Sequence, residues 1–390
     1  MPPNGSLDSQ SAPWLAEDLL PKTTLDGETG VWRDKAEPMS LAQIEAHLRN
    51  QKADDTAPIH WVEVPGCSRV AHVSEIPELW EAQKERDLRL AKTAIRSNRV
   101  ITLLTVAGSI TVIACGAPPQ VPIVLLVFGI QSAETWFEAT NANRRLRRNP
   151  SKYFHQCSRE ARYSFWAYSI PDSVLWRTWS LSATWVVLFG IQSVVGLDSS
   201  IAQAGLVKSE VRRGEVWRLL TGAMINGNIW HIWMNATSGI MLALLIERTA
   251  NRHVLLPLWL LGALGGSLCS LMFLPEATSV GASGGLLGFV GFLAVLGWKR
   301  KHLLPPQFAV NILRSVGFTA LFGLLAWSVI DNAAHAGGAL AGALAGYCLC
   351  EHEEGGLPFP DTVWRIALGW WGVSAFGALF GFTVWRLLKP

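Results

Sequence analysis

A serine and two histidines lie in apolar segments of this 390-residue chain, where ionisable side chains are costly and usually functional. Ser283 belongs to a Gly-Ala-Ser-Gly-Gly run, His335 belongs to an Ala-His-Ala-Gly-Gly run, and His231 lies four residues before Asn235. A serine hydroxyl becomes an effective nucleophile when a nearby base accepts its proton. Ser283 and His335 could therefore carry out nucleophilic hydrolysis as a pair.

Attack by such a serine on an amide creates an oxyanion, which needs preorganised hydrogen-bond donors. Ser283 lies at the predicted start of a helix, where backbone N–H groups are free and the helix dipole favours negative charge. His231 and Asn235 are at positions i and i+4, so a helix would present both side chains on one face. The sequence thus contains candidates for a nucleophile, a base and an oxyanion hole.

The composition indicates the environment of these residues. Half of the residues are hydrophobic, 16% are charged, and 19 are tryptophans, which collect at membrane–water boundaries. These values exclude an ordinary soluble domain, and the net charge of +3 gives no indication of a nucleic-acid partner. The six cysteines lack metal-ligand spacing, so we predict no metal site.

Nine apolar runs have about the ~20-residue length needed to cross a bilayer, which predicts an all-α polytopic membrane protein. Basic clusters such as 144–148 and 299–301 mark the cytoplasmic ends. The polar N-terminus has no apolar signal region, so the first apolar helix is expected to act as an uncleaved insertion signal. The predicted spans are residues 100–117, 121–137, 179–197, 229–246, 254–274, 281–298, 308–330, 333–350 and 366–388.

This topology places the N-terminus in the cytoplasm and predicts a multi-pass protein of the cell membrane. Ser283, His335 and His231 then lie near the starts of three helices that all come in from the extracytoplasmic side, at similar depth. Asp331 lies one turn before His335 and could contact the imidazole, but we expect it instead to be solvated at the outer surface.

Glycine spacing predicts that the serine and histidine helices touch. Gly284 and Gly288 are a small-xxx-small pair in the serine helix, and Gly338 and Gly342 are one in the histidine helix. Missing side chains let two helix backbones approach closely in lipid. Because His335 precedes Gly338 by one turn, its imidazole is expected near the crossing point.

The remaining chain divides into segments with distinct composition. Residues 1–95 are predicted to be a small soluble cytosolic region, α/β or partly disordered, in which Ser40 caps a short helix, 59–64 form a strand and 75–96 a charged helix. The hypothesis for this region is binding to a cytosolic partner. The predicted domains after it are a transmembrane hairpin at 96–137, a basic juxtamembrane linker at 138–171, a six-helix core at 172–350, and an inner loop with a last transmembrane helix at 351–390.

These motifs together resemble those of the rhomboid intramembrane serine proteases. The 281–284 run matches the family's GxSG motif, 334–338 looks like its AHxGG helix, 231–235 matches its HxxxN, and Trp217-Arg218 resembles the WR motif of its first outer loop. The resemblance covers about residues 172–350, in the family's order and on six consecutive helices.

The resemblance implies roles for these positions. Ser283 would be the nucleophile and His335 the base, while His231, Asn235 and the Ser283 backbone N–H would bind the oxyanion. The remaining motif positions would be structural: Trp217, Arg218, Gly281, Gly284, Gly288, Gly338 and Gly342. It also implies that no metal or other cofactor is required. The implied substrates are membrane proteins of the lipid bilayer, cleaved within or beside a transmembrane helix that contains weak helix formers.

Two positions depart from the family pattern. Asn226 stands where the family often has another histidine, five residues before His231. Leu287 stands where an aromatic residue commonly stacks on the catalytic imidazole, so the orientation of His335 would be looser and the activity lower.

Two other functions fit parts of the sequence. A catalytically silent relative would bind membrane helices without cleaving them, but such relatives usually lack the serine or the histidine, and both are present. A transporter could also line a pathway with polar groups on glycine-rich helices. No inverted repeat is visible, however, and the polar groups lie near one membrane surface.

Overall fold

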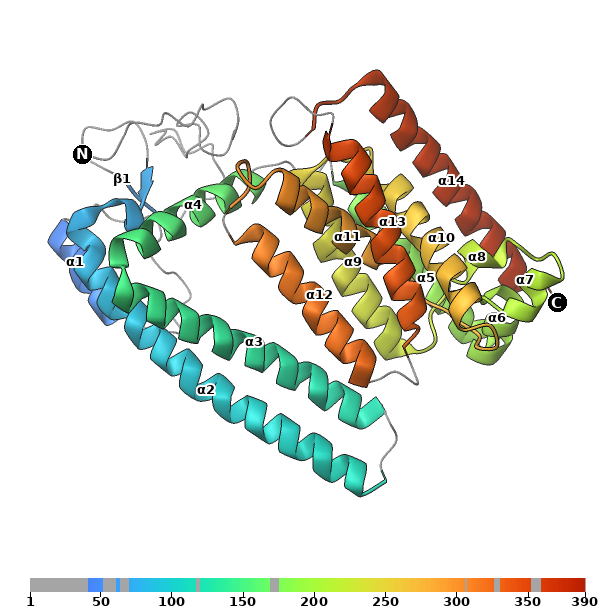
Figure 1. The fold of residues 1–390 in the computed structure, drawn as a ribbon, viewed down its shortest axis with the longest axis horizontal. Helices are drawn as coiled ribbons and strands as arrows, with labels where there is room; N and C mark the ends of the chain where they lie inside the picture. Colours follow the sequence, from blue (N-terminus) through green and yellow to red (C-terminus); the bar gives the residue numbers. More distant parts are fainter. Residues whose placement is uncertain are drawn as a thin grey trace. The chain divides into compact units, whose positions relative to one another are not determined.

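The computed structural model describes residues 41–51, 61–63, 70–116, 120–168, 175–305, 307–325, 330–351 and 359–389. The chain forms two compact units, an N-terminal unit within residues 14–166 and a C-terminal unit that includes residues 167–390. The described residues are overwhelmingly helical (Figure 1), and the prediction of an all-α polytopic protein is confirmed.

The N-terminal unit contains a small packed end and two long helices. Its elements are α1 (Leu41–Asn50), β1 (Trp61–Glu63), β2 (Val70–His72), two 3₁₀ turns (Val73–Glu75 and Pro77–Leu79), α2 (Trp80–Ala114), α3 (Gln120–Arg148) and α4 (Pro150–Tyr168). The two short strands pair antiparallel, with Val62 opposite Ala71. Leu48, Val73, Leu79 and Ala82 form a fully buried cluster that joins α1 to the start of α2.

The charged helix and the first apolar span, which the sequence separates at 96–100, form one continuous helix, α2. No glycine or proline lies between Trp80 and Val106, so nothing in the sequence stops the helix at the change from charged to apolar residues. The structure places β1 inside the predicted strand 59–64, whereas Ser40, the predicted cap of α1, lies outside the described residues.

The C-terminal unit consists of helices joined by short connections. Its elements are α5 (Trp176–Val195), α6 (Leu197–Ala204), α7 (Lys208–Arg212), α8 (Arg218–Thr221), α9 (Ile229–Thr249), α10 (Leu255–Phe273), α11 (Ser283–Lys299), α12 (Phe308–Leu325), α13 (Asn332–Glu351) and α14 (Val363–Leu388). The segment 198–228, predicted only as a long outer loop, contains the three short helices α6–α8.

Six helices of the described chain are long and apolar enough to cross a membrane, and the protein is a multi-pass membrane protein. They are α2 with its preceding turn, α5, α9, α10, α13 and α14, while α11 and α12 contain shorter apolar stretches. Every one of the nine predicted spans coincides with a helix in the described residues. The apolar parts of α2, α9 and α14 expose large aliphatic and aromatic side chains, as expected of lipid-facing surfaces.

Helices α10, α11 and α13 pack against one another in the C-terminal unit (Figure 1). Glycines make this packing close: a Cβ atom on Gly262 of α10 would lie 3.0 Å from the Cα atom of Gly288 on α11. A Cβ atom on Gly338 or Gly342 of α13 would overlap the carbonyl of Gly284 or Gly288. The α11–α13 contact is therefore backbone against backbone.

Helix α14 packs on α10 and contacts the rest of the unit near both of its ends. Near its start, Asp361 accepts hydrogen bonds from Asn251 at 2.9 Å and from Arg252 at 2.7 Å. Near its end, the Arg386 guanidinium lies 4.5 Å from the ring centre of Trp217.

Candidate active site

Ser283 is the first residue of α11, and a glycine turn brings it there. Gly281 has φ +124°, in the left-handed region that residues with a side chain rarely adopt, and the chain turns at this point into the helix. The Gly281 N–H donates a 2.9 Å hydrogen bond to the carbonyl of Gly222 at the end of α8, which fixes the turn to the α6–α8 segment. The Ser283 hydroxyl thus lies at a helix N-terminus, beside unpaired backbone N–H groups.

The imidazole of His335 meets this hydroxyl. His335 Nε2 and Ser283 Oγ are 2.8 Å apart, although the residues are far apart in the sequence, and both side chains are half-buried. If Nε2 accepts the serine proton, Nδ1 must carry the ring hydrogen. Nδ1 is buried and has no hydrogen-bond partner among the described residues, so no carboxylate completes a triad in this part of the chain.

The close contact of α11 and α13 explains this distance. His335 lies one turn before Gly338, whose Cα faces the carbonyl of Gly284, the residue after Ser283. Larger residues at either glycine would separate the two helices and with them the hydroxyl and the imidazole.

His231 and Asn235 lie on α9 beside the backbone that leads to Ser283. Asn228 caps α9 by accepting the His231 N–H at 2.9 Å. A Cβ atom on Gly281 would lie 2.6 Å from His231 Nε2 and 3.5 Å from Asn235 Nδ2, so both nitrogen atoms face this turn. The Gly227 N–H donates to His231 Nδ1 at 3.3 Å, which leaves Nε2 as the protonated nitrogen and a donor toward the turn.

Asn226, one of the two departures in the sequence, is fully buried and orients Asn235. Its Oδ1 accepts a 2.7 Å hydrogen bond from Asn235 Nδ2. Its own backbone N–H and carbonyl both pair with the Gln192 side chain at 3.0 Å. Sequence reasoning missed this role, although a polar residue just before a polar i, i+4 pair could have suggested it.

Leu287, the other departure, lies one turn after Ser283 and is half-buried. Within the described ranges, no aromatic ring stacks on His335.

Trp217 and Arg218 lie at the start of α8, and their described contacts are with the α6–α8 segment and with α14. Arg218 is buried and binds the Gly205 carbonyl at 2.9 Å and Glu215 at 2.5 Å. Trp217 lies against the Arg218 guanidinium at 4.6 Å and meets Phe382 of α14 edge-on at 5.5 Å. Both side chains thus hold α6–α8 together and against α14.

Two charged residues outside the predicted set, buried Lys208 and half-buried Asp331, form a cluster with two serines. Lys208 Nζ lies 3.9 Å from Asp331 Oδ2 and donates to Ser279 Oγ at 2.9 Å. Ser279 Oγ also donates to Asp331 Oδ2 at 2.5 Å, and Ser270 is a further partner of that oxygen. The prediction of a solvated Asp331 is therefore wrong, because Lys208 of α7 and the two serines surround its carboxylate and only 18% of the side chain is exposed.

No group of three His, Cys, Asp or Glu side chains converges as a metal site would, as far as the described residues go.

Comparison with known proteins places these residues in a family. The rhomboid domain model matches residues 213–352. RHOMBOID-like protein 6, mitochondrial, of Arabidopsis thaliana is 32% identical over 157 residues, which is 38% of this chain and 48% of the relative. Rhomboid protease GluP of Bacillus subtilis is 27% identical over 217 residues, covering 55% of this chain and 41% of the relative.

Rhomboid-related protein 2 of Mus musculus is 25% identical over 223 residues, covering 54% of this chain and 68% of the relative. The match spans less than half the length of the first two relatives. The matched region contains Ser283, His335, His231, Asn235, Asn226 and Asp331, whereas Gln192 and Lys208 lie before it.

Residues 213–352 of this chain thus form a rhomboid domain, and the relatives that match the chain are rhomboid proteins.

Proposed function

We propose that this protein is an intramembrane serine endopeptidase of the cell membrane, with Ser283 and His335 as its catalytic dyad. The observation that carries the proposal is the 2.8 Å contact between His335 Nε2 and Ser283 Oγ, made at a helix start inside a multi-pass membrane protein. That the relative from B. subtilis is named a rhomboid protease supports the same class of reaction.

In the proposed reaction, His335 Nε2 accepts the proton of Ser283 Oγ as this oxygen bonds to the carbonyl carbon of the scissile amide. The carbonyl oxygen gains the negative charge, and His335 then gives the proton to the leaving amine as the C–N bond breaks. A water molecule, deprotonated by the same imidazole, hydrolyses the resulting ester and regenerates the hydroxyl.

The proposed oxyanion hole consists of the Ser283 N–H, the His231 Nε2–H and the Asn235 amide. Two observations support it: both side-chain nitrogen atoms face the Gly281 turn, and the start of α11 adds the dipole of a helix N-terminus. One Asn235 N–H is held by Asn226, so the second N–H is the one available for the oxyanion.

The proposed substrates are transmembrane segments that unwind readily. An amide inside a regular helix is hydrogen-bonded and shielded, so Ser283 could attack it only where the helix opens. Segments with glycine or proline near their outer boundary lose the least helix stability when the helix opens, because these residues are weak helix formers.

We place the reaction near the extracytoplasmic surface. Supporting this orientation, Lys299 and Arg300 mark the end of α11 opposite to Ser283, and basic residues favour the cytoplasmic side.

The test is cleavage of a purified single-span substrate with glycine and proline near its outer boundary. Parent protein should release two fragments, and Ser283→Ala should be slower by at least about 10³-fold. Ser193→Ala is the matched control because Ser193 Oγ only bonds back to Phe189 in α5. Equal fragment release by Ser283→Ala and parent, or none by either, would contradict the proposal.

Gly281→Ala is expected to lower cleavage by at least about 10-fold without preventing folding. Its methyl group would meet the edge of His231 at 2.5 Å, and φ +124° is strained by about 1–2 kcal/mol for a residue with a Cβ atom. The measurement is kcat beside the thermal unfolding midpoint. Gly190→Ala, where no atom lies within 4 Å of the new methyl group, should match the parent; equal rates for both variants would argue against the role of this turn.

Asn235→Ala is expected to lower kcat by about 10²–10³-fold with a smaller change in KM, because the amide donates most strongly to the charged intermediate. Asn226→Ala should cost less, about 10-fold, since the amide stays but loses its orienting bond. Steady-state kinetics of both variants check this order. A larger loss for Asn226→Ala would show that Asn226 has a role of its own.

A further inference from the structure

The cluster of Lys208, Ser279 and Asp331 lies where α7 contacts the chain that leads into α11, the serine helix, and into α13, the histidine helix. Ser279 lies four residues before Ser283, and Asp331 lies four residues before His335. Ser279 is also held by its backbone, which pairs with Leu206 through two hydrogen bonds of 2.9 and 3.2 Å. The cluster therefore contacts the backbone segment that precedes Ser283 and the one that precedes His335.

The two oxygen atoms of Asp331 have different partners. Oδ1 accepts the N–H of Ala334 at 2.8 Å and so caps the first turn of α13, next to His335. Oδ2 receives the two serine hydroxyls and faces the Lys208 ammonium. One carboxylate thus joins the start of the histidine helix to the α6–α8 segment.

Because the Lys208–Asp331 pair is shielded from water, each charge depends on the other for compensation. Only 1% of the Lys208 side chain and 18% of the Asp331 side chain are exposed. Burial lowers the pKa of Lys208, and the Asp331 charge opposes this effect. Removing either charge leaves the other buried without compensation, which is more damaging than removing both.

We propose that Lys208, Ser279 and Asp331 are positioning residues that set the separation of Ser283 and His335. The proposal rests on the proposed protease function and deepens it. The cluster acts through the helix starts, so its loss is expected to slow the chemical step while substrate binding changes little.

The experiment is a double-mutant cycle with Lys208→Met, Asp331→Asn and the variant that carries both substitutions. Each single variant should lower kcat by about 10–100-fold with KM within about twofold of the parent. The double variant should regain most of the rate, because asparagine still caps the helix and no buried charge remains unpaired. Arg212→Met is the matched control: it removes an exposed pair with Glu276 from the same short helix, and its kcat should stay within about twofold.

Hydrogen exchange gives a second readout that needs no activity. Amides 332–338 should exchange faster in both single variants than in the parent and recover in the double variant. The proposal is overturned if the single variants keep the parent kcat and exchange, or if the double variant is as slow as the slower single variant. An inactive parent protein would instead refute the proposed function, and the exchange of α13 would still decide the positioning role.

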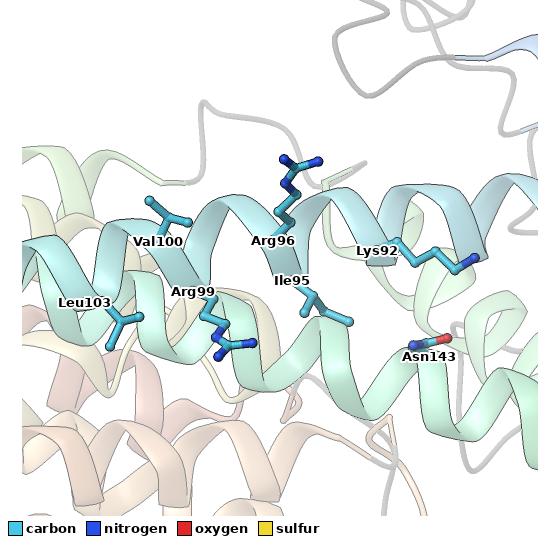
Figure 2. A pocket seen from close by; sticks show the side chains of 7 residues that line it. All are labelled: Lys92, Ile95, Arg96, Arg99, Val100, Leu103 and Asn143. Carbon is cyan, nitrogen blue, oxygen red and sulfur yellow. The ribbon is translucent and has the colours of Figure 1, made fainter.

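A separate feature of the N-terminal unit indicates a ligand site independent of the protease. A surface hollow of about 450 Å³ lies between α2 and α3. Figure 2 shows six of its lining side chains on successive turns of α2 and the seventh, Asn143, on α3. The α2 residues are Lys92, Ile95, Arg96, Arg99, Val100 and Leu103.

The charges of this hollow are all of one sign. Lys92, Arg96 and Arg99 are exposed, have no ion-pair partner among the described residues, and no carboxylate lines the hollow. Asn143 Oδ1 accepts a 3.0 Å hydrogen bond from Arg147, which leaves the Asn143 amide hydrogens as donors. The lining therefore offers positive charge and hydrogen-bond donors, as an anionic phosphate requires.

The apolar end of the hollow continues into the membrane span. Val100 and Leu103 are exposed by 51% and 57%, and Leu104 and Ile110 follow on α2 with 66% and 63%. A free phosphate would gain nothing from these side chains, whereas acyl chains would lie against them. We infer that the hollow binds the headgroup of an anionic glycerophospholipid.

The test is native mass spectrometry of the full chain released from detergent with phosphatidylglycerol or phosphatidylcholine. Parent protein should retain phosphatidylglycerol preferentially, and the double variant Arg96→Gln/Arg99→Gln should weaken its retention by roughly 25-fold, about fivefold per cation. Arg144→Gln/Arg148→Gln removes the same charge from the end of α3, outside the lining, and should have little effect.

Equal losses of phosphatidylglycerol retention in both double variants would show that the lipid binds a diffuse basic surface only, and the proposed site would be overturned. Equal retention of the two lipids by the parent would overturn it as well. Inorganic phosphate at millimolar concentration should not displace phosphatidylglycerol; full displacement would identify a free-anion site in place of a lipid site.

Discussion

Replacing His335 with alanine is expected to lower substrate cleavage by at least about 10³-fold while the protein stays folded. The Ser283 hydroxyl would lose the one imidazole within hydrogen-bond distance in the described structure, and an unassisted serine is a weak nucleophile. Folding should change little, since the lost side chain is half-buried and makes a single hydrogen bond in the described structure, worth about 1 kcal/mol.

Two measurements check this expectation. A fluorophosphonate probe should label Ser283 in the parent and not in His335→Ala, and the cleavage assay should show the same loss. His302→Ala is the matched control, because His302 is exposed in the turn after α11, and it should label like the parent. Labelling of His335→Ala at the parent rate would mean that another base activates Ser283.

Replacing Gly338 with valine is expected to abolish measurable activity and to destabilise the protein. The added Cβ atom would overlap the Gly284 carbonyl and lie 3.1 Å from the Gly284 Cα, so α11 and α13 must separate. Overpacking of this kind costs about 1–3 kcal/mol of unfolding free energy. A shift of about 1 Å at the reacting atoms lowers the rate by a further ~10²-fold.

Gly317→Val provides the control for helix propensity and bulk. Gly317 is an exposed residue of α12, and no atom lies within 4 Å of a Cβ atom placed there. Thermal unfolding and probe labelling of both variants separate lost packing from lost chemistry. Parent-like labelling of Gly338→Val would show that the helices can move apart without separating Ser283 from His335.

The sequence predicted most of the transmembrane fold because each span carries its own signal. Apolar runs of membrane length and basic clusters at their ends are local properties, and the helices α5 and α9–α14 lie where these runs are. The continuity of α2 was missed for the same reason, since a change from charged to apolar residues does not by itself end a helix.

The residues around the reacting pair were harder to predict because their partners are remote in the sequence. Lys208 and Asp331 each look like ordinary surface charges, and only the packing of the α6–α8 segment beside the start of α13 brings them together. Asn226 looked like a loss relative to the family pattern, yet its side chain holds Asn235. The assignment of catalytic roles to Ser283 and His335 stays a prediction until the variants are measured.

The contact between α11 and α13 also limits how this protein can change. At Gly338 and Gly342 the opposing surface is the peptide backbone of α11, so no facing side chain could shorten to make room for a new methyl group. A random screen for second-site suppressors of Gly338→Val should therefore recover reversion to glycine and not compensating substitutions on α11. In most protein interiors a larger residue can be accommodated when a facing side chain becomes smaller. At the α11–α13 contact this exchange cannot occur, because the facing atoms are backbone atoms.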